Sequence, residues 1–166
     1  MSIKKGTKVK LDQKMLDEAY QLGKLRSDTH PKGYKRVKGL HHITGDQEGL
    51  CGELAFAILI DASYSQFKSI KEVKVGSFKD KGDCVYRELN IDVKTSRYKT
   101  ANLLVLRHKL IDSEIDAYVL MTGFYGDYTF RGYITKDQIK KEIEKDNLDL
   151  KKDVYWIPQK YLDDLP

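Results

Sequence analysis

Apolar residues follow helical spacing in three stretches of the chain. The first runs from Leu11 to Leu25, with Asp12 as a helix cap or first-turn acid. The second runs from about Gln47 to Ser63 and is apolar on most sides, which predicts a largely buried helix. A shorter stretch, from Asp137 to Lys145, has the pattern of a surface helix. We therefore expect three helices, one of them central to the core.

Between the second and third helices, apolar and polar residues alternate as they do in β-strands. The alternation predicts strands at about 72–78, 83–88, 89–95, 102–107, 117–124 and 127–134. The connection between the second and third is tight and predicts an antiparallel hairpin. Helices at both ends of a run of strands indicate an α/β (α+β mixed) fold, with a central mixed sheet flanked by helices. We expect a single domain spanning 1–166, with frayed polar residues at 1–10 and a packed apolar tail beginning at Trp156.

Composition narrows the function only slightly. The chain has 166 residues, of which 33% are charged, and a net charge of +5. A basic balance is compatible with a polyanionic partner such as nucleic acid. No apolar run reaches the ~20 residues that cross a membrane, and the basic N-terminus lacks the apolar stretch of a signal peptide. We expect a cytoplasmic protein, in which Cys51 and Cys84 are small buried residues and not zinc ligands or a disulfide.

Asp92 and Lys94 are the residues with the clearest chemical potential. They alternate with Leu89, Ile91 and Val93, so the acid and the lysine share the face opposite to the apolar one. The simple explanation is a water-exposed face of a half-buried sheet. The alternative is a site, because the predicted hairpin brings Asp83 on the preceding strand beside Asp92. Two carboxylates at such a distance raise each other's pKa unless a cation such as Mg²⁺ lies between them.

Glu53 is a charged residue in an otherwise apolar helix. Because an unpaired buried charge is costly, Glu53 lies either at an exposed helix edge, or in a salt bridge, or in a site. The flanking Gly49 and Gly52 lower helix propensity and permit close approach of the helix to the sheet. Such an approach would deliver the Glu53 carboxylate to the carboxylates there.

These residues occur in the order Gly49-Leu50-Cys51-Gly52-Glu53-Leu54-Ala55, Asp83 and Ile91-Asp92-Val93-Lys94-Thr95-Ser96. The order resembles that of the PD-(D/E)XK nuclease superfamily, with its restriction-endonuclease-like core, and is most similar to small phage-type members. The resemblance extends from about Gly49 to Ile134, and Glu88 is a second acid near the first half-motif. No proline precedes Asp83, a departure that is frequent in the superfamily.

The resemblance implies a Mg²⁺-dependent deoxyribonuclease, in which Mn²⁺ could replace Mg²⁺. Asp83, Asp92, Glu53 and the Val93 carbonyl would hold the metal, and Lys94 would stabilise the phosphorane or orient water. Ser96, Arg97 and Lys99 would grip DNA phosphates, with Arg131 and Lys136 as weaker candidates. A homodimer is one arrangement the resemblance implies, because two strands need two sites. If the chain is phage-encoded, its compartment would be the host cytoplasm.

Other hypotheses stay open at this point. A catalytically inactive nucleic-acid-binding module, or a protein-interaction module on the same fold, would have a similar sequence. His41 and His42 are adjacent on a polar loop, where two neighbours do not converge naturally on one ion. A solvated turn would equally explain residues 95–99.

Overall fold

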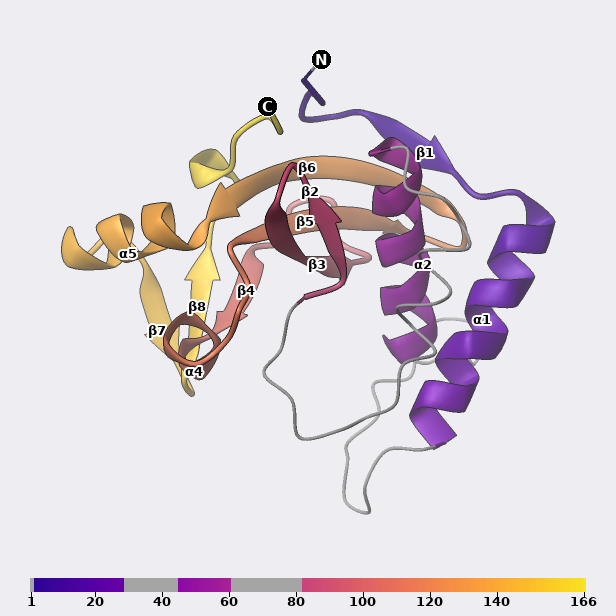
Figure 1. Ribbon diagram of the computed structural model, residues 1–166, viewed down its shortest axis with the longest axis horizontal. Helices are drawn as coiled ribbons and strands as arrows, with labels where there is room; N and C mark the ends of the chain where they lie inside the picture. Colours follow the sequence, from indigo (N-terminus) through magenta and orange to yellow (C-terminus); the bar gives the residue numbers. More distant parts are fainter. Residues whose placement is uncertain (1, 29–44, 61–81) are drawn as a thin grey trace.

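The computed structural model describes residues 2–28, 45–60 and 82–166. Helices and strands are interspersed along this part of the chain (Figure 1). The helices are α1 (Gln13–Asp28), α2 (Gly45–Leu59), α4 (Arg107–Ile111), α5 (Lys136–Glu144) and the short 3₁₀ helix η2 (Gln159–Tyr161). The strands are β1 (Lys8–Lys10), β2 (Cys84–Tyr86), β3 (Leu89–Ser96), β4 (Leu103–Leu106), β5 (Ala117–Phe124), β6 (Asp127–Thr135), β7 (Asp149–Lys151) and β8 (Val154–Ile157).

A five-stranded mixed sheet forms the centre, in the order β1-β6-β5-β3-β2. β3 and β5 are parallel, because β4 and α4 carry the chain back between them, and the other neighbours are antiparallel. A second sheet has the order β4-β8-β7. The predicted fold class, mixed α/β with a central mixed sheet flanked by helices, is confirmed.

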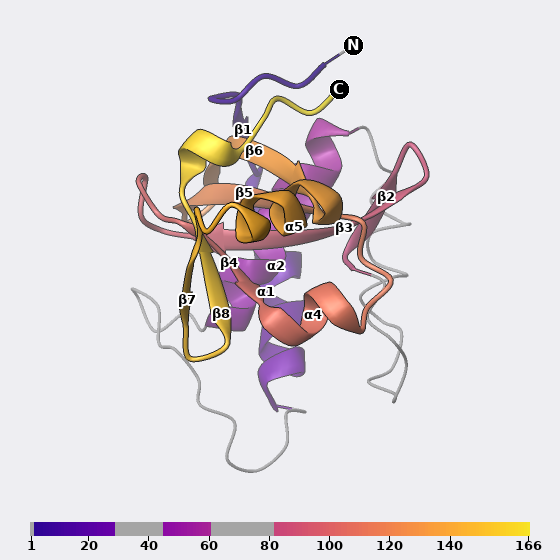
Figure 2. The same ribbon diagram turned by 90° about the vertical axis from the view of Figure 1, so that its left-hand side faces the viewer.

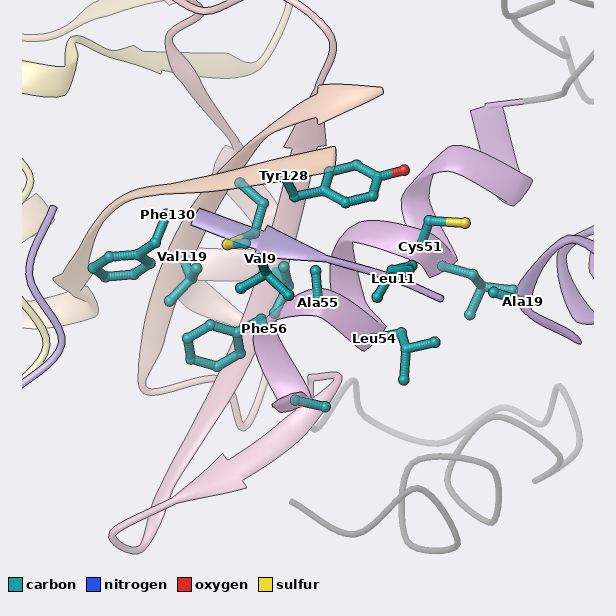
Figure 3. Packing of buried hydrophobic residues seen from close by; sticks show 14 of the residues in the cluster. Val9, Leu11, Ala19, Cys51, Leu54, Ala55, Phe56, Val119, Tyr128 and Phe130 are labelled. Carbon is teal, nitrogen blue, oxygen red and sulfur yellow. The ribbon is translucent and has the colours of Figure 1, made fainter. Parts of the chain in front are cut away.

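The two faces of the central sheet are covered by different layers. Odd-numbered residues of β3 and β5, such as Ile91, Val93 and Val119, pack against α1 and α2. Figure 3 shows this core, in which the rings of Phe56 from α2 and Phe130 from β6 stack with centroids 6.3 Å apart. The second sheet, α4 and α5 lie on the opposite side, in front of α1 and α2 in Figure 2.

The second layer, formed by the β4-β8-β7 sheet, α4 and α5, covers only part of that face of the central sheet. Its core includes Tyr118 and Leu120 of β5 and Ile134 of β6, and no residue of β5 beyond Leu120. Figure 1 shows β4, β7, β8 and α5 gathered at one end of the central sheet, away from the β5–β6 turn. That turn has Tyr125 and Gly126 in the left-handed region, at φ 54° and 93°, as expected for a hairpin.

The three predicted helices are present, with boundaries shifted by a few residues. Asp12 caps α1, since its Oδ1 accepts a hydrogen bond of 2.8 Å from the N–H of Met15. α5 begins with a reciprocal capping box between Thr135 and Gln138. The predicted strand at 72–78 and the loop carrying His41 and His42 lie outside the described residues. None of the described helices has the length and hydrophobicity needed to cross a membrane.

One expectation about the chain ends is wrong. The described residues 2–10 are not frayed: β1 pairs with β6, and Ile3 bridges to Leu165 beside the C-terminus. The strand was not predicted because Val9 is its one apolar residue. Val9 is buried, whereas the lysines on either side of it, Lys8 and Lys10, are exposed. The apolar tail beginning at Trp156 packs onto the body as expected, since Ile157, Leu162 and Leu165 are buried. Its first residues belong to the β7–β8 hairpin, whose turn uses Lys152 and Asp153 at positive φ in place of the usual Asn-Gly.

Candidate functional site: an acidic cluster around one lysine

The β2–β3 hairpin positions the first two acids. Its turn consists of Arg87 and Glu88, at φ 47° and 68°, and it pairs Cys84 with Ile91. Continuing the same register places Asp83 opposite Asp92, as the sequence predicted. The N–H of Asp83 donates to the Ile91 carbonyl at 2.7 Å, so the ladder extends to this residue. Glu88, the alternative acid, occupies the turn at the far end of the hairpin.

Asp83 also binds the backbone of β3. Its Oδ2 accepts a hydrogen bond of 2.7 Å from the N–H of Val93. The N–H and C=O of one strand residue project to the same side. The Val93 carbonyl, a predicted metal ligand, therefore lies on the outer edge of β3, beside Asp83.

Asp92 and Lys94 share the face of β3 opposite to Ile91 and Val93. The Asp92 residue is only 6% exposed, which rules out a fully solvated face. Lys94 places its Nζ 2.6 Å from Asp92 Oδ2 while its side chain stays 42% exposed. The pair therefore consists of a buried carboxylate and an ammonium that reaches solvent.

Glu53 reaches this site from α2. The helix touches the sheet at Gly52, where an added Cβ would overlap the Thr95 side chain. Glu53, the next residue, is only 7% exposed. Gly52 thus fulfils the predicted role of a close-approach glycine, whereas Gly49 has no atom near its missing Cβ and does not.

The electrostatics of Lys94 connect the four residues. Burial by itself would lower the pKa of this lysine, but the charges of Asp92, Asp83 and Glu53 outweigh it, so the pKa is raised. The structure therefore brings all four predicted catalytic residues together, three carboxylates within electrostatic reach of one ammonium. They lie beyond the β2–β3 ladder, where Asp83 precedes β2 and the outer edge of β3 continues past its pairing with β2.

The predicted metal ligands are all oxygen donors: the Asp83, Asp92 and Glu53 carboxylates and the Val93 carbonyl. Carboxylates and a backbone carbonyl are the oxygen ligands that Mg²⁺ takes. Within residues 2–28, 45–60 and 82–166, no three His, Cys, Asp or Glu side chains converge closely enough to enclose an ion. Asp83 Oδ2 accepts a hydrogen bond from the Val93 N–H, and Asp92 Oδ2 contacts the Lys94 ammonium. The ligand types fit Mg²⁺, whereas the described side chains as they stand do not enclose an ion.

The predicted phosphate-binding residues follow β3. Ser96 is its last residue, and Arg97 and Lys99 lie in the turn beyond it. Arg97 and Lys99 line a pocket of about 510 Å³ on the central sheet. Lys136 is not part of this pocket: its Nζ donates to the Ser113 carbonyl at 3.1 Å.

The same pocket also contains two cationic residues that were not predicted to bind phosphate and one that was only a weaker candidate. Lys8 and Lys10 enter it from β1, and Arg131 enters it from β6. The available signal was the alternation of Lys8, Val9 and Lys10, which is typical of a strand with one buried face.

Glu48 is another acid on α2, and no local sequence pattern distinguishes it as functional. The hydroxyl of Tyr20 on α1 donates to its Oε1 at 3.0 Å, and that of Tyr128 on β6 donates to its Oε2 at 2.7 Å. This carboxylate therefore joins three elements of the core.

Compared with protein-family models, curated proteins and solved structures, the chain has no significant match. What the structure defines is a mixed α/β protein with an acidic cluster around a lysine at a sheet edge. The restriction-endonuclease-like core stays a prediction.

Proposed function

We propose that this protein is a metal-dependent deoxyribonuclease that hydrolyses phosphodiester bonds with a site of the PD-(D/E)XK type. The observation that carries the proposal is the gathering of Glu53, Asp83 and Asp92 around Lys94 at one sheet edge. Three carboxylates are grouped near one ammonium, and those of Glu53 and Asp92 are on buried residues. Groups of interacting ionisable side chains of this kind are found most often where function requires them.

Asp83, Asp92, Glu53 and the Val93 carbonyl would hold Mg²⁺, with Mn²⁺ as a substitute. When bound, the ion would supply a water of lowered pKa and neutralise charge on the phosphate. Asp83 has a fixed position for this role because the Val93 N–H holds one of its oxygens. The close contact of Gly52 with Thr95 fixes α2, and with it Glu53.

Lys94 would act as an electrostatic group. Its raised pKa keeps the ammonium protonated at neutral pH, so it cannot serve as a general base in this state. A protonated, partly exposed ammonium can instead donate hydrogen bonds to a phosphate oxygen as negative charge develops there. Asp92 orients it through their 2.6 Å contact.

The alternative is a module that binds nucleic acid or protein without cutting. The basic pocket would serve a nucleic-acid-binding module equally well. The acidic cluster favours the enzyme, because a phosphate-binding surface gains nothing from three carboxylates, two of them on buried residues, beside it.

Incubation of supercoiled plasmid with Mg²⁺ or Mn²⁺ tests the proposal. Wild type should nick or linearise the plasmid, and Asp92→Ala and Lys94→Ala should each cut at least about 10³-fold more slowly. Asp149→Ala and Lys140→Ala, at exposed positions on β7 and α5, are matched controls and should cut normally. Absence of cutting by wild type, or equal cutting by the site variants, would rule out the enzyme. DNA binding without cutting would favour the inactive module.

A further inference from the structure

A basic groove crosses the part of the central sheet that the second layer leaves open. Five cationic side chains line it against one acid, Asp127. The cationic residues are Lys8, Lys10, Arg97, Lys99 and Arg131. A groove with one dominant sign of charge concentrates a polyanion.

The strand registers align polar residues in a row across this groove. Lys8 pairs with Thr129, Thr129 with Thr122, and Thr122 with Ser96. Each of these residues alternates with one that packs on the α2 side, so all four side chains project from the opposite face. The row therefore carries a cation, Lys8, and the hydroxyls of Thr129 and Ser96 that can bind phosphate oxygens, while the buried Thr122 hydroxyl holds Arg131.

Two arginines in the groove have fixed orientations. Arg131 donates from Nε to Thr122 Oγ1 at 2.7 Å, which directs its two Nη groups as a fork. Arg97 lies over the Tyr98 ring, with its guanidinium carbon 5.0 Å from the centroid, and donates to the Tyr98 hydroxyl at 3.0 Å. A guanidinium held in this way loses little entropy when it binds a phosphate through two hydrogen bonds.

The row of polar residues ends at Ser96, which adjoins the groove residue Arg97 and lies near the acidic cluster. Ser96 follows Lys94 on the same face of β3, about 7 Å along the strand. From Ser96 to Lys8 the row crosses three strand spacings, or about 14 Å. That length is sufficient for contacts to more than one phosphate of a single strand.

We propose that this groove binds the sugar–phosphate backbone of one nucleic-acid strand, on one side of the bond that is cut at Lys94. The direction of the strand relative to the cut rests on the proposed nuclease function, whereas the binding itself does not. Evenly spaced donors on rigid strands match a phosphate backbone better than the mobile carboxylates of an acidic polypeptide. Contacts to phosphates alone predict binding without sequence preference.

Salt-dependent binding tests the groove without any cutting. Fluorescently labelled 16-nucleotide DNA strands of two unrelated sequences are titrated in EDTA at several salt concentrations. Lys8→Ala combined with Lys10→Ala should weaken binding of both sequences about tenfold and reduce the slope of log K against log salt by about two. Lys140→Ala combined with Lys141→Ala removes the same charge from the exposed side of α5 and should leave both values unchanged.

Arg131→Lys keeps the charge but removes the fork, so it should weaken binding with little change in slope. Thermal unfolding verifies that each variant is folded. A groove variant that binds like wild type would overturn the proposal, as would polyglutamate displacing the DNA as effectively as unlabelled DNA does. If wild type binds DNA in the groove but cuts no plasmid, only the nuclease function fails. If wild type cuts and groove variants bind and cut normally, only the groove fails.

Discussion

Glu48 and Glu53 both lie on helix α2, and their surroundings are opposite. Glu48 accepts hydrogen bonds from two tyrosine hydroxyls, one on α1 and one on β6. Burial is the main reason that the pKa of both Tyr20 and Tyr128 is raised, so each hydroxyl keeps the proton that it donates. Burial likewise raises the pKa of the neighbouring Cys51 thiol to about 12, which leaves it un-ionised and unreactive at neutral pH. One negative charge is surrounded by neutral donors.

Glu53, on the same helix, lies near two further carboxylates and one ammonium. Neutral donors would satisfy a structural carboxylate at a lower energetic cost than this crowding does. The difference shows how a structural acid that is partly or fully buried can be told from a functional one. A carboxylate whose partners are all neutral donors holds the fold together, whereas a group of carboxylates sharing one cation is arranged for a charged ligand.

Removal of Glu48 should give the largest loss of stability. Glu48→Ala leaves the Tyr128 hydroxyl, on a residue only 2% exposed, without its acceptor and disconnects α1 from β6. We expect the free energy of unfolding to fall by about 2–4 kcal/mol, measured by urea unfolding at pH 7. Plasmid cutting at a temperature where the variant is fully folded should remain within about threefold of wild type.

Asp92→Asn should show the converse behaviour. It removes one of three repelling carboxylates while keeping the side-chain shape, so stability should change by less than about 1 kcal/mol, while cutting is lost. A Glu48→Ala protein that is stable but inactive, or an Asp92→Asn protein that is unstable but active, would contradict the assignment of the two acids.

The two glycines of α2 give a smaller and more local test. In Gly52→Ala the new methyl group overlaps Thr95, so α2 must move away from β3. We expect a loss of about 1–3 kcal/mol in the free energy of unfolding. Cutting should also slow, because Glu53 moves with the helix.

Gly49→Ala is the matched control on the same helix. Nothing lies within 4 Å of its added Cβ, so the better helix propensity of alanine should stabilise the protein by about 0.5–1 kcal/mol. Equal effects of the two substitutions on unfolding would show that the contact with Thr95 does not fix the helix.

The acidic cluster could be predicted from the sequence because its information is local. Alternation fixes the shared face of Asp92 and Lys94, and a short hairpin with a two-residue turn fixes the position of Asp83. Glu53 was found by its contrast with an apolar helix. Each inference needed only neighbouring residues and one turn.

The groove and the Glu48 site depend on distant pairings. Lys8 meets Thr129 only because β1 joins the far edge of the sheet, and three residues of β1 are too few to give a clear strand signal. Glu48 meets Tyr128 through packing of α2 on β6, which no local pattern encodes. The β7–β8 hairpin was missed for a different reason, since Lys152 and Asp153 are unusual residues for its turn.

Alkaline pH should weaken the contribution of the Glu48 site to stability gradually. Unfolded tyrosine loses its proton near the ordinary pKa of 10.0, whereas Tyr20 and Tyr128 keep theirs in the folded protein because their pKa is raised. The unfolded state therefore binds fewer protons, so stability is full below pH 10 and falls as pH rises above it. The loss per tyrosine cannot exceed about 1.4 kcal/mol per pH unit.

Urea unfolding between pH 9 and 11 in metal-free buffer measures this loss. The Tyr20→Phe, Tyr128→Phe double variant is less stable at pH 9 but should lose less stability than wild type as pH rises. Lys94 contributes with the same sign only above its ordinary pKa of 10.5, since its folded pKa is also raised. Wild type should therefore begin to lose stability before Lys94 titrates in the unfolded chain. A double variant with the full wild-type pH dependence would show that the two tyrosines do not retain their protons around Glu48.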